Sequence, residues 1–363
     1  MKVCHITTVH PKNDNRIYYK ECTTLKNNGH DVTLIVAGEI DQEIEGIKII
    51  GLSKHNSRLK RFFRTSISEV IKTVNKVNAD IYHFHDPELI FMGLILKLKG
   101  EKVIYDIHEN NSAAIMSKPY IKSKLSKKVI SSFFNLFEKF AVRCFDGIVT
   151  ARPDITEKFN HKKIITLRNF PILTKSSDDD INKAIKEKKS VIYVGVMTEI
   201  RGIETLLDAF NEMPEFELWL LGIVRGDFLS KKIKKSNENI KYLGIVEPFE
   251  VFQYIKKSDA GIITFLPVPN HIRTLATKPF EYMACGKPMI MSNFEYWKNT
   301  FGDSSLYVDP NSKGEIIQAT RLLLNDEEML DKMAKKNAKL SKEKYNWEVE
   351  SKKLIDLYNS FLT

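Results

Sequence analysis

Glu281 is the one acidic side chain in an otherwise apolar and tightly punctuated segment, TKPFEYMACGKPMIMSN, residues 277–293. Thr277 is a suitable N-cap for a short helix, Gly286 can end that helix, and PMIMSN then has the composition of a buried strand. The start of such a helix suits a phosphate group, and Lys278 adds a full positive charge. One turn further, an ionised Glu281 could accept both hydroxyls of a ribose; a surface acid favoured by the helix dipole is the alternative that these residues leave open.

Histidines and carboxylates gather at the ends of two predicted strands in the first half of the chain, in DIYHFHDPE and KVIYDIHEN. His108 ends the second of these strands, where a partly buried structural histidine is the alternative to a functional one. Asp86 precedes Pro87 and could equally cap a helix. His83 and His85 share a strand face and could bind a metal with His108, but the sequence offers no clear second shell. We therefore predict no metal site.

Short β-rich runs alternating with longer helical runs must position these residues. Between the first two runs, RIYYKECTTLKNNGHDVT is typical of a helix that Asp14 or Asn15 can cap and that Gly29 can end in a left-handed conformation. The result is a βαβ unit with a right-handed crossover. The Val- and Ile-rich character of the runs is what strands covered on both faces require. In the first half the candidate strands are KVCHITTV, DVTLIVA, GIKIIGL, DIYHFH, KVIYDIH and DGIVTA.

The second half repeats this plan without a detectable sequence repeat, with candidate strands SVIYVGV, FELWLLG, NIKYLG, DAGIITF, PMIMSN and SLYVD. The segment 171–190 between the halves is polar and charged, which favours a linker, and its acidic run 178–180 reads as solvated charge rather than a metal site. Two doubly wound domains joined in this way would leave a cleft facing the carboxyl ends of both sheets, where such folds place ligands.

The composition is that of a globular protein with about two domains: 363 residues, of which 43% are hydrophobic and 28% charged. No run approaches the roughly 18 apolar residues of a spanning helix, and the first residues turn polar too soon for a signal peptide. Four cysteines without CxxC spacing favour a reducing compartment, so we expect a cytoplasmic protein. The net charge of +10 indicates an anionic partner without choosing among phosphates, nucleic acid and membranes.

The segment around Glu281 resembles the donor site of the GT-B glycosyltransferases, specifically glycosyltransferase family 4, in which a run TKxFEYMAxGxPVIxS holds the nucleotide of an activated sugar. Other segments resemble the family in the same order: HPKNDNRIYYKE, DIYHFHDPE, KVIYDIHEN, IYVGVMTEIRGIETLLDAF and YNWEVESKKLIDLY. The resemblance covers essentially the whole chain. It implies an α/β fold of two Rossmann-like, doubly wound parallel-sheet domains facing a central cleft. These would be an acceptor-side domain at 1–170, a nucleotide-sugar-binding domain at 171–345, and a helix at 346–363 that crosses back to the first domain.

The resemblance also implies roles for individual residues. Cations would face the diphosphate, and a glycine turn would let the backbone approach it. These groups would stabilise the leaving diphosphate without a bound metal or other cofactor. Family members retain the anomeric configuration, and no protein nucleophile is assigned. The catalytic residues implied are His108, Arg201 and Lys278; those that bind the donor are Glu281, Gly195, Thr277, Arg273 and Asn270; those on the acceptor side are Asp14, Arg16, His85, Asp86, Glu88 and Glu109.

Two departures from the family pattern concern the donor. Val196 follows Gly195 where the family often carries an arginine, so that one phosphate-facing cation is missing and Lys278 would compensate. Arg273 stands eight residues before Glu281, where many members have an acid that meets the donor sugar. One hypothesis is that Arg273 or the neighbouring His271 meets an acidic sugar such as a uronate.

Two basic segments, 57–76 and 117–140, carry apolar residues at roughly helical spacing. A basic face with aromatic neighbours suits an anionic membrane surface, while packing of the apolar stripe on a sheet is the alternative. No nucleic-acid-binding motif is present, and we expect no nucleic-acid partner.

We therefore predict a retaining glycosyltransferase of the hexosyltransferase class. Its donor would be a nucleotide diphosphate sugar, with uridine favoured over guanosine, and its acceptor a glycan or lipid-linked oligosaccharide of a bacterial surface polysaccharide such as O-antigen or capsule. It would act in the cytoplasm, with peripheral contact at the inner face of the membrane left open. The alternatives are a UDP-sugar 2-epimerase of the same fold and a non-catalytic membrane-associated binding protein. A dinucleotide dehydrogenase is disfavoured because no GxGxxG follows the first strand.

Overall fold

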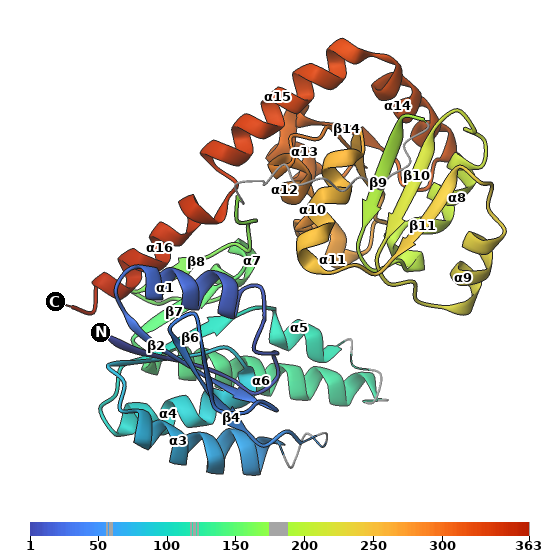
Figure 1. Ribbon diagram of the computed structural model, residues 1–363. Coiled ribbons are helices and arrows are strands. Elements are labelled where there is room, and N and C mark those ends of the chain that lie inside the picture. The colour runs from blue at the N-terminus through green and yellow to red at the C-terminus, as the bar shows by residue number, and fades with distance from the viewer. Residues whose placement is uncertain are drawn as a thin grey trace. The chain divides into compact units, whose positions relative to one another are not determined.

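The computed structural model describes residues 1–55, 57, 61–116, 118, 121, 123–173 and 188–362 (Figure 1). The chain divides into two compact units, each built around one sheet. Unit 1 comprises Met1–Asn169 together with Glu350–Thr363, and unit 2 comprises Phe170–Val349. Most of the predicted linker, including the acidic run 178–180, lies outside the described residues.

The sheet of unit 1 has eight strands in the order β3-β4-β2-β1-β5-β6-β7-β8. All neighbouring pairs are parallel except β3 with β4. The six strands predicted for this half are confirmed, whereas the three-residue strands β3 and β8 were missed because neither is long enough to show a pattern. The strands are β1 Lys2–Thr7, β2 Asp31–Ala37, β3 Gln42–Ile44, β4 Ile47–Leu52, β5 Ile81–Phe84, β6 Val103–Ile107, β7 Gly147–Thr150 and β8 Ile164–Thr166.

Helices connect these strands, and their apolar faces pack into the core of unit 1. The predicted first helix starts at a cap made by Asp14, whose Oδ1 accepts hydrogen bonds from the backbone N–H groups of Arg16 and Ile17. Gly29 follows that helix with a φ of +81°, as predicted. The helices are η1 Ile17–Cys22, α1 Thr23–Asn27, η2 Arg61–Glu69, α3 Val70–Val77, η3 Pro87–Leu89, α4 Ile90–Leu98, α5 Asn111–Met116, α6 Lys124–Cys144, α7 Pro153–Thr156 and, in part, α16 Trp347–Asn359.

The sheet of unit 2 has six strands, all parallel, in the order β11-β10-β9-β12-β13-β14. All six were predicted. Their buried residues form one hydrophobic core with the apolar faces of the surrounding helices. The strands are β9 Ser190–Val194, β10 Glu217–Leu221, β11 Ile240–Gly244, β12 Ala260–Ile263, β13 Met289–Ser292 and β14 Ser305–Val308.

The helices of unit 2 include the short one predicted around Glu281, which runs from Lys278 to Ala284 and is followed by Gly286 with a φ of +63°. That glycine ends the helix as predicted, because a left-handed conformation is costly for other residues. The helices are η4 Glu199–Arg201, α8 Ile203–Phe210, α9 Asp227–Lys234, α10 Pro248–Lys257, α11 Pro269–Ile272, α12 Lys278–Ala284, α13 Glu295–Phe301, η5 Gly302–Ser304, α14 Lys313–Asn325 and α15 Glu327–Glu343.

Parallel strands place the loops that follow them at one edge of each sheet. In unit 1 the loops after β1, β5 and β6 are neighbours, because β5 pairs with both β1 and β6. In unit 2 the loops after β9 and β12 are neighbours for the same reason. Each edge is where this class of sheet places its ligands.

Candidate functional site

In unit 2 the helix that carries Glu281, α12, is hydrogen-bonded directly to the end of β9. The hydroxyl of Tyr282 accepts a hydrogen bond from the Val194 backbone N–H and donates to the Ile192 carbonyl, both at 3.1 Å. Gly195 is the next residue after that strand, and its φ is +140°. The structure therefore brings the predicted glycine turn and the predicted acid to the same edge of the sheet.

Arg201 reaches this edge from the short helix η4. The Ile200 carbonyl accepts a hydrogen bond from the Leu266 N–H in the loop after β12, and the Arg201 guanidinium lies over the Phe265 ring, 5.2 Å from its centroid. A Cβ atom on Gly195 would approach Arg201 Nη1 to 3.2 Å, so the bare glycine gives the guanidinium room. The following Gly202 has a φ of +69°, and a Cβ there would come within 1.8 Å of the Thr264 carbonyl oxygen.

Lys278 and Glu281 form a close ion pair on the first turn of α12. The Lys278 Nζ lies 2.8 Å from Glu281 Oε1 and 2.6 Å from Oε2, and the carboxylate side chain is 16% exposed. Thr277 occupies the N-cap position, but its side chain makes no capping hydrogen bond, unlike the predicted cap. The carboxylate is thus half-buried and held by a cation, rather than turned outward as a free surface acid.

The remaining predicted donor residues lie on α11 and just after it. Asn270 and Arg273 are exposed, and Arg273 is the C-cap residue that follows α11. His271 is half-buried, its Nδ1 is 3.0 Å from the Leu266 carbonyl oxygen, and its ring lies 4.7 Å from that of Phe265. Burial lowers the pKa of His271, and the nearby charge of Arg201 lowers it further, so this imidazole is neutral. Arg273 is therefore the cation of this segment.

In unit 1 the predicted His108 lies at the end of β6 and contacts a carboxylate of its own strand. Its Nε2 is 3.1 Å from Asp106 Oδ2, and its side chain is 19% exposed. Asp106 is buried and receives two hydrogen bonds from Arg16, Nε to Oδ2 at 2.9 Å and Nη2 to Oδ1 at 3.0 Å. Although burial by itself would raise the pKa of Asp106, the charges of Arg16 and His108 hold it well below its usual range. Asp106 is ionised and fixes the ring of His108.

Four of the predicted acceptor-side residues have buried or largely enclosed polar groups that bind other protein groups. Arg16 donates hydrogen bonds to Asp106 and to the Leu167 carbonyl. His85 lies between His5 and His108, its Nε2 at 2.9 Å from His5 Nδ1 and its Nδ1 at 3.3 Å from His108 Nε2. Asp86 Oδ2 accepts from the Thr7 hydroxyl and the Thr8 N–H, and Glu88 accepts from Arg61 and Thr8. These contacts indicate positioning rather than an open surface for an acceptor.

Asp14 and Glu109 differ from those four. Asp14 caps the first helix through Oδ1 and is 21% exposed, and Glu109 is exposed directly after His108. Asp86 occupies the N-cap position of η3, the alternative left open for it, but its side chain makes no capping hydrogen bond and instead holds the loop after β1.

His10, which was not predicted from the sequence, also lies at this edge. Its Nδ1 lies 3.2 Å from Asp14 Oδ2, its Nε2 lies 3.6 Å from Asp86 Oδ1, and its ring is 4.9 Å from that of His108. Burial acts to lower the pKa of His10, but the hydrogen bond to Asp14 and the charges of Asp86, Asp14 and Asp106 raise it overall. The signal in the sequence was the spacing His10-x-x-x-Asp14 immediately after the first strand.

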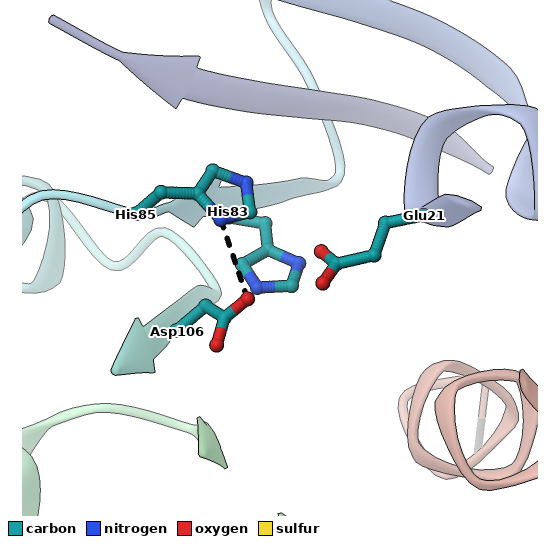
Figure 2. Close-up of side chains that lie close together, drawn as sticks. All are labelled: Glu21, His83, His85 and Asp106. Carbon is teal, nitrogen blue, oxygen red and sulfur yellow. Dashed lines mark ion pairs between the residues drawn. The ribbon is translucent and has the colours of Figure 1, made fainter. Parts of the chain in front are cut away.

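Behind this edge lies a buried group of residues whose composition resembles a metal site (Figure 2). Glu21, His83, His85 and Asp106 each offer one ligand atom within 4.8 Å of the others. Among the described residues, His83 Nε2 has no hydrogen-bond partner. However, Arg16 Nε lies 3.0 Å from Glu21 Oε1 and 2.9 Å from Asp106 Oδ2. The guanidinium already forms an ion pair with Asp106 and lies against Glu21, so a metal cation would have to be accommodated against its positive charge.

The same group continues to the C-terminal helix. The Tyr358 hydroxyl lies 2.9 Å from His83 Nδ1 and 3.4 Å from His5 Nε2. Burial lowers the pKa of His5 and His83 well below the ordinary value and that of His85 to about 4. Burial and the adjacent charge of Asp106 raise the pKa of Glu21. We read the group as neutral histidines and a protonated glutamic acid around one ion pair.

Comparison with known proteins finds family models that match segments of both units. The model of the family described as Glycosyltransferase Family 4 matches residues 15–165, and that of Glycosyl transferases group 1 matches residues 174–340. Together these matches extend over most of the chain. The chain belongs to glycosyltransferase family 4.

Relatives and solved structures resemble this family 4 glycosyltransferase at low identity. An uncharacterized glycosyltransferase of Methanocaldococcus jannaschii is 22% identical, with 92% of this chain and 90% of the relative covered. The O-antigen chain mannosyltransferase B of Escherichia coli is 27% identical over 55% of this chain and 58% of its own. The Anabaena protein HepE, solved in complex with UDP and glucose, has a TM-score of 0.70 and 13% identity over 99% and 100% of the two chains. The fold is the predicted GT-B fold.

Proposed function

We propose that this family 4 glycosyltransferase moves a hexosyl group from a uridine diphosphate sugar to a hydroxyl of a glycan or lipid-linked oligosaccharide, with retention of the anomeric configuration. The observation that carries the donor half is the convergence of Gly195, Arg201 and the Lys278–Glu281 pair at one edge of unit 2. The UDP complex of the similarly folded Anabaena protein supports uridine. The O-antigen role of the Escherichia coli relative supports a surface polysaccharide as the product.

The chemistry of each group follows from its charge. A ribose offers two hydroxyl donors to the Glu281 carboxylate and would release Lys278 from its present ion pair. Lys278 would then be free, with Arg201, to balance the charge that grows on the leaving diphosphate. Two fixed cations can do this work without a metal ion. The acceptor proton would pass to an oxygen of that diphosphate, so no protein base is required for its removal.

In unit 1 we propose that His108 contacts the donor sugar or its phosphate near the reacting carbon. Its Nε2 is occupied by Asp106, which leaves Nδ1 as the ring nitrogen available to a substrate. A fixed ring position is what a group at a reacting centre needs. His10 and Glu109 are the partly exposed neighbours that would meet the acceptor.

Product analysis tests this proposal. The chain would be incubated with UDP-glucose, UDP-galactose, UDP-N-acetylglucosamine and UDP-glucuronate, with and without a mixture of bacterial oligosaccharides, and the products followed by proton NMR. We expect UDP release that depends on acceptor and a new α-anomeric signal from an α-linked donor. Conversion of the donor without acceptor would establish the epimerase instead, and turnover of UDP-glucuronate alone would support the role suggested for Arg273.

A further inference from the structure

The solvent-exposed face of α6 is apolar. Figure 1 shows where this helix lies in unit 1. Successive members are separated by four, four, three and four positions and fall within about 80° on a helical wheel. We call this set the α6 stripe; its members and their exposed fractions are Leu125 72%, Val129 60%, Phe133 73%, Leu136 70% and Phe140 59%.

The opposite face of α6 already satisfies the packing of unit 1. Ala141 and Val142 are buried, and Phe134 and Phe137 pack against the core. Glu138 is buried as well, and its carboxylate accepts hydrogen bonds from Asn111, Tyr105 and Lys158. A helix of this kind normally carries polar residues on its second face. The α6 stripe is therefore not required by the fold.

Every exposed charge on α6, all of whose residues the structure describes, is positive. Lys124, Lys128, Lys139 and Arg143 are exposed, whereas Glu138, the one acid of the helix, is buried. Phe91 of α4 is 51% exposed and stacks against Phe137, which extends the apolar surface beside the stripe. Large apolar side chains bordered by lysine and arginine are the combination that binds in the interface of an anionic bilayer.

Among its described residues, the other basic segment leaves one large apolar residue exposed, Phe63 of η2 at 62%, rather than a stripe. In α3 the apolar residues Val70 and Val74 are buried in the core, so that their spacing serves packing. Of the two candidate membrane segments in the sequence, the one that forms α6 leaves a whole stripe of large apolar residues unpacked.

We propose that the α6 stripe inserts into the headgroup region of an anionic bilayer and holds unit 1 on the membrane surface. Among the described residues no helix is long and apolar enough to cross a membrane, so α6 would lie along the surface. A second copy of the chain is the less favourable occupant, because a two-fold contact through the same face would bring both sets of exposed cations together. This surface is independent of the donor and acceptor proposed above.

Vesicle binding of the full chain tests the proposal without any substrate. The chain would be floated with vesicles of phosphatidylcholine alone or mixed with phosphatidylglycerol, at low and high salt. We expect binding to the mixed vesicles that weakens at high salt and is slight on phosphatidylcholine alone. The double variant F133S/L136S should lose at least about tenfold in binding, and K128E/K139E should lose about as much on the anionic vesicles.

Matched controls separate this surface from general charge and hydrophobicity. K335E/K339E makes the same change in net charge on α15, where both lysines are exposed, and L98S/L322S removes two exposed leucines elsewhere. Both controls should bind as the unaltered chain does. Thermal unfolding and circular dichroism would confirm that all variants fold. Equal binding by the stripe variants, binding that ignores the anionic lipid, or a dimer that F133S/L136S dissociates while vesicle binding is absent would each overturn the proposal.

Discussion

Arg16 and Asp106, 90 residues apart in the chain, form a buried two-pronged ion pair between the loop after β1 and the end of β6. Their side chains are 6% and 0% exposed, and Asp106 also contacts His108. The pair therefore stabilises unit 1 and, through Asp106, also fixes the position of the proposed catalytic residue His108.

Removing one partner of this pair should be costly, because the other charge would stay buried and unpaired. We expect D106N to lower the free energy of unfolding by about 3–5 kcal/mol. R16K should also destabilise, since an ammonium cannot reproduce both bonds of the guanidinium. Urea unfolding followed by circular dichroism measures these changes.

The chain provides a matched control in Arg152 and Asp154, which form the same two-pronged pair at the surface. These side chains are 35% and 41% exposed, and D154N should cost less than about 1 kcal/mol. Similar losses for D106N and D154N would contradict the role given to the buried pair.

The contribution of Glu21 to stability should change with pH in the opposite direction from that of Asp106. Its raised pKa means that the folded chain holds a proton that the unfolded chain releases as pH rises above the ordinary glutamate value of 4.5. Stability from this group therefore falls with rising pH. We expect E21Q to be at least as stable as the unaltered chain at about pH 8, measured by thermal unfolding. A large destabilisation at that pH would show that Glu21 is ionised in the folded state.

The buried histidines should make the chain sensitive to mild acid. The unfolded chain gains protons near pH 6.5, whereas in the folded chain His85 resists protonation until about pH 4, and His5 and His83 have lowered pKa values as well. Stability is therefore lost as pH falls through this window, with His85 alone contributing on the order of 3 kcal/mol by pH 4. Urea midpoints across this range should fall steadily, and less steeply for H85Q. A flat profile would mean that these imidazoles are already charged.

Glu281→Ala should abolish nucleotide recognition while leaving the fold intact, because the carboxylate is half-buried and its partner Lys278 can reach solvent. UDP or a UDP-sugar should raise the melting temperature of the unaltered chain and leave that of E281A unchanged. Glu295, the exposed first-turn acid of α13, supplies the control, and E295A should retain the full shift. If UDP still raised the melting temperature of E281A, the proposed binding of the ribose by Glu281 would be refuted.

His108→Ala and His10→Gln should separate binding from transfer. Both should keep the thermal shift given by UDP, because the donor nucleotide is assigned to unit 2. Each should lower kcat, H108A by about a hundredfold or more, as expected for a group at the reacting centre. H161Q, which alters a half-buried histidine bonded to the Phe145 carbonyl, should retain full turnover. Unchanged turnover in H108A would refute its role.

Local patterns in the sequence were sufficient for the elements and for part of the donor site. Continuous Val- and Ile-rich runs predicted all twelve longer parallel strands, and Asp14, Gly29 and Gly286 marked helix ends correctly. These features depend on residues within a few positions of one another. The same holds for Lys278 and Glu281, which are neighbours on one helical turn.

The sequence could not predict which groups would meet from distant segments. Asp106 was read only as part of a strand, because its partner Arg16 becomes its neighbour only when β1, β5 and β6 lie side by side. His85, expected to line the acceptor side, is enclosed by His5 and His108 for the same reason.

The two basic segments show the same limit on a larger scale. Helical spacing of apolar residues establishes that a helix has an apolar face. The sequence alone determined this for both basic segments. Whether that face is buried depends on which face of the helix packs against the sheet, and this is decided by the tertiary structure. Only the packing around Glu138, Ala141 and Val142 decided that α6 leaves its stripe to the solvent.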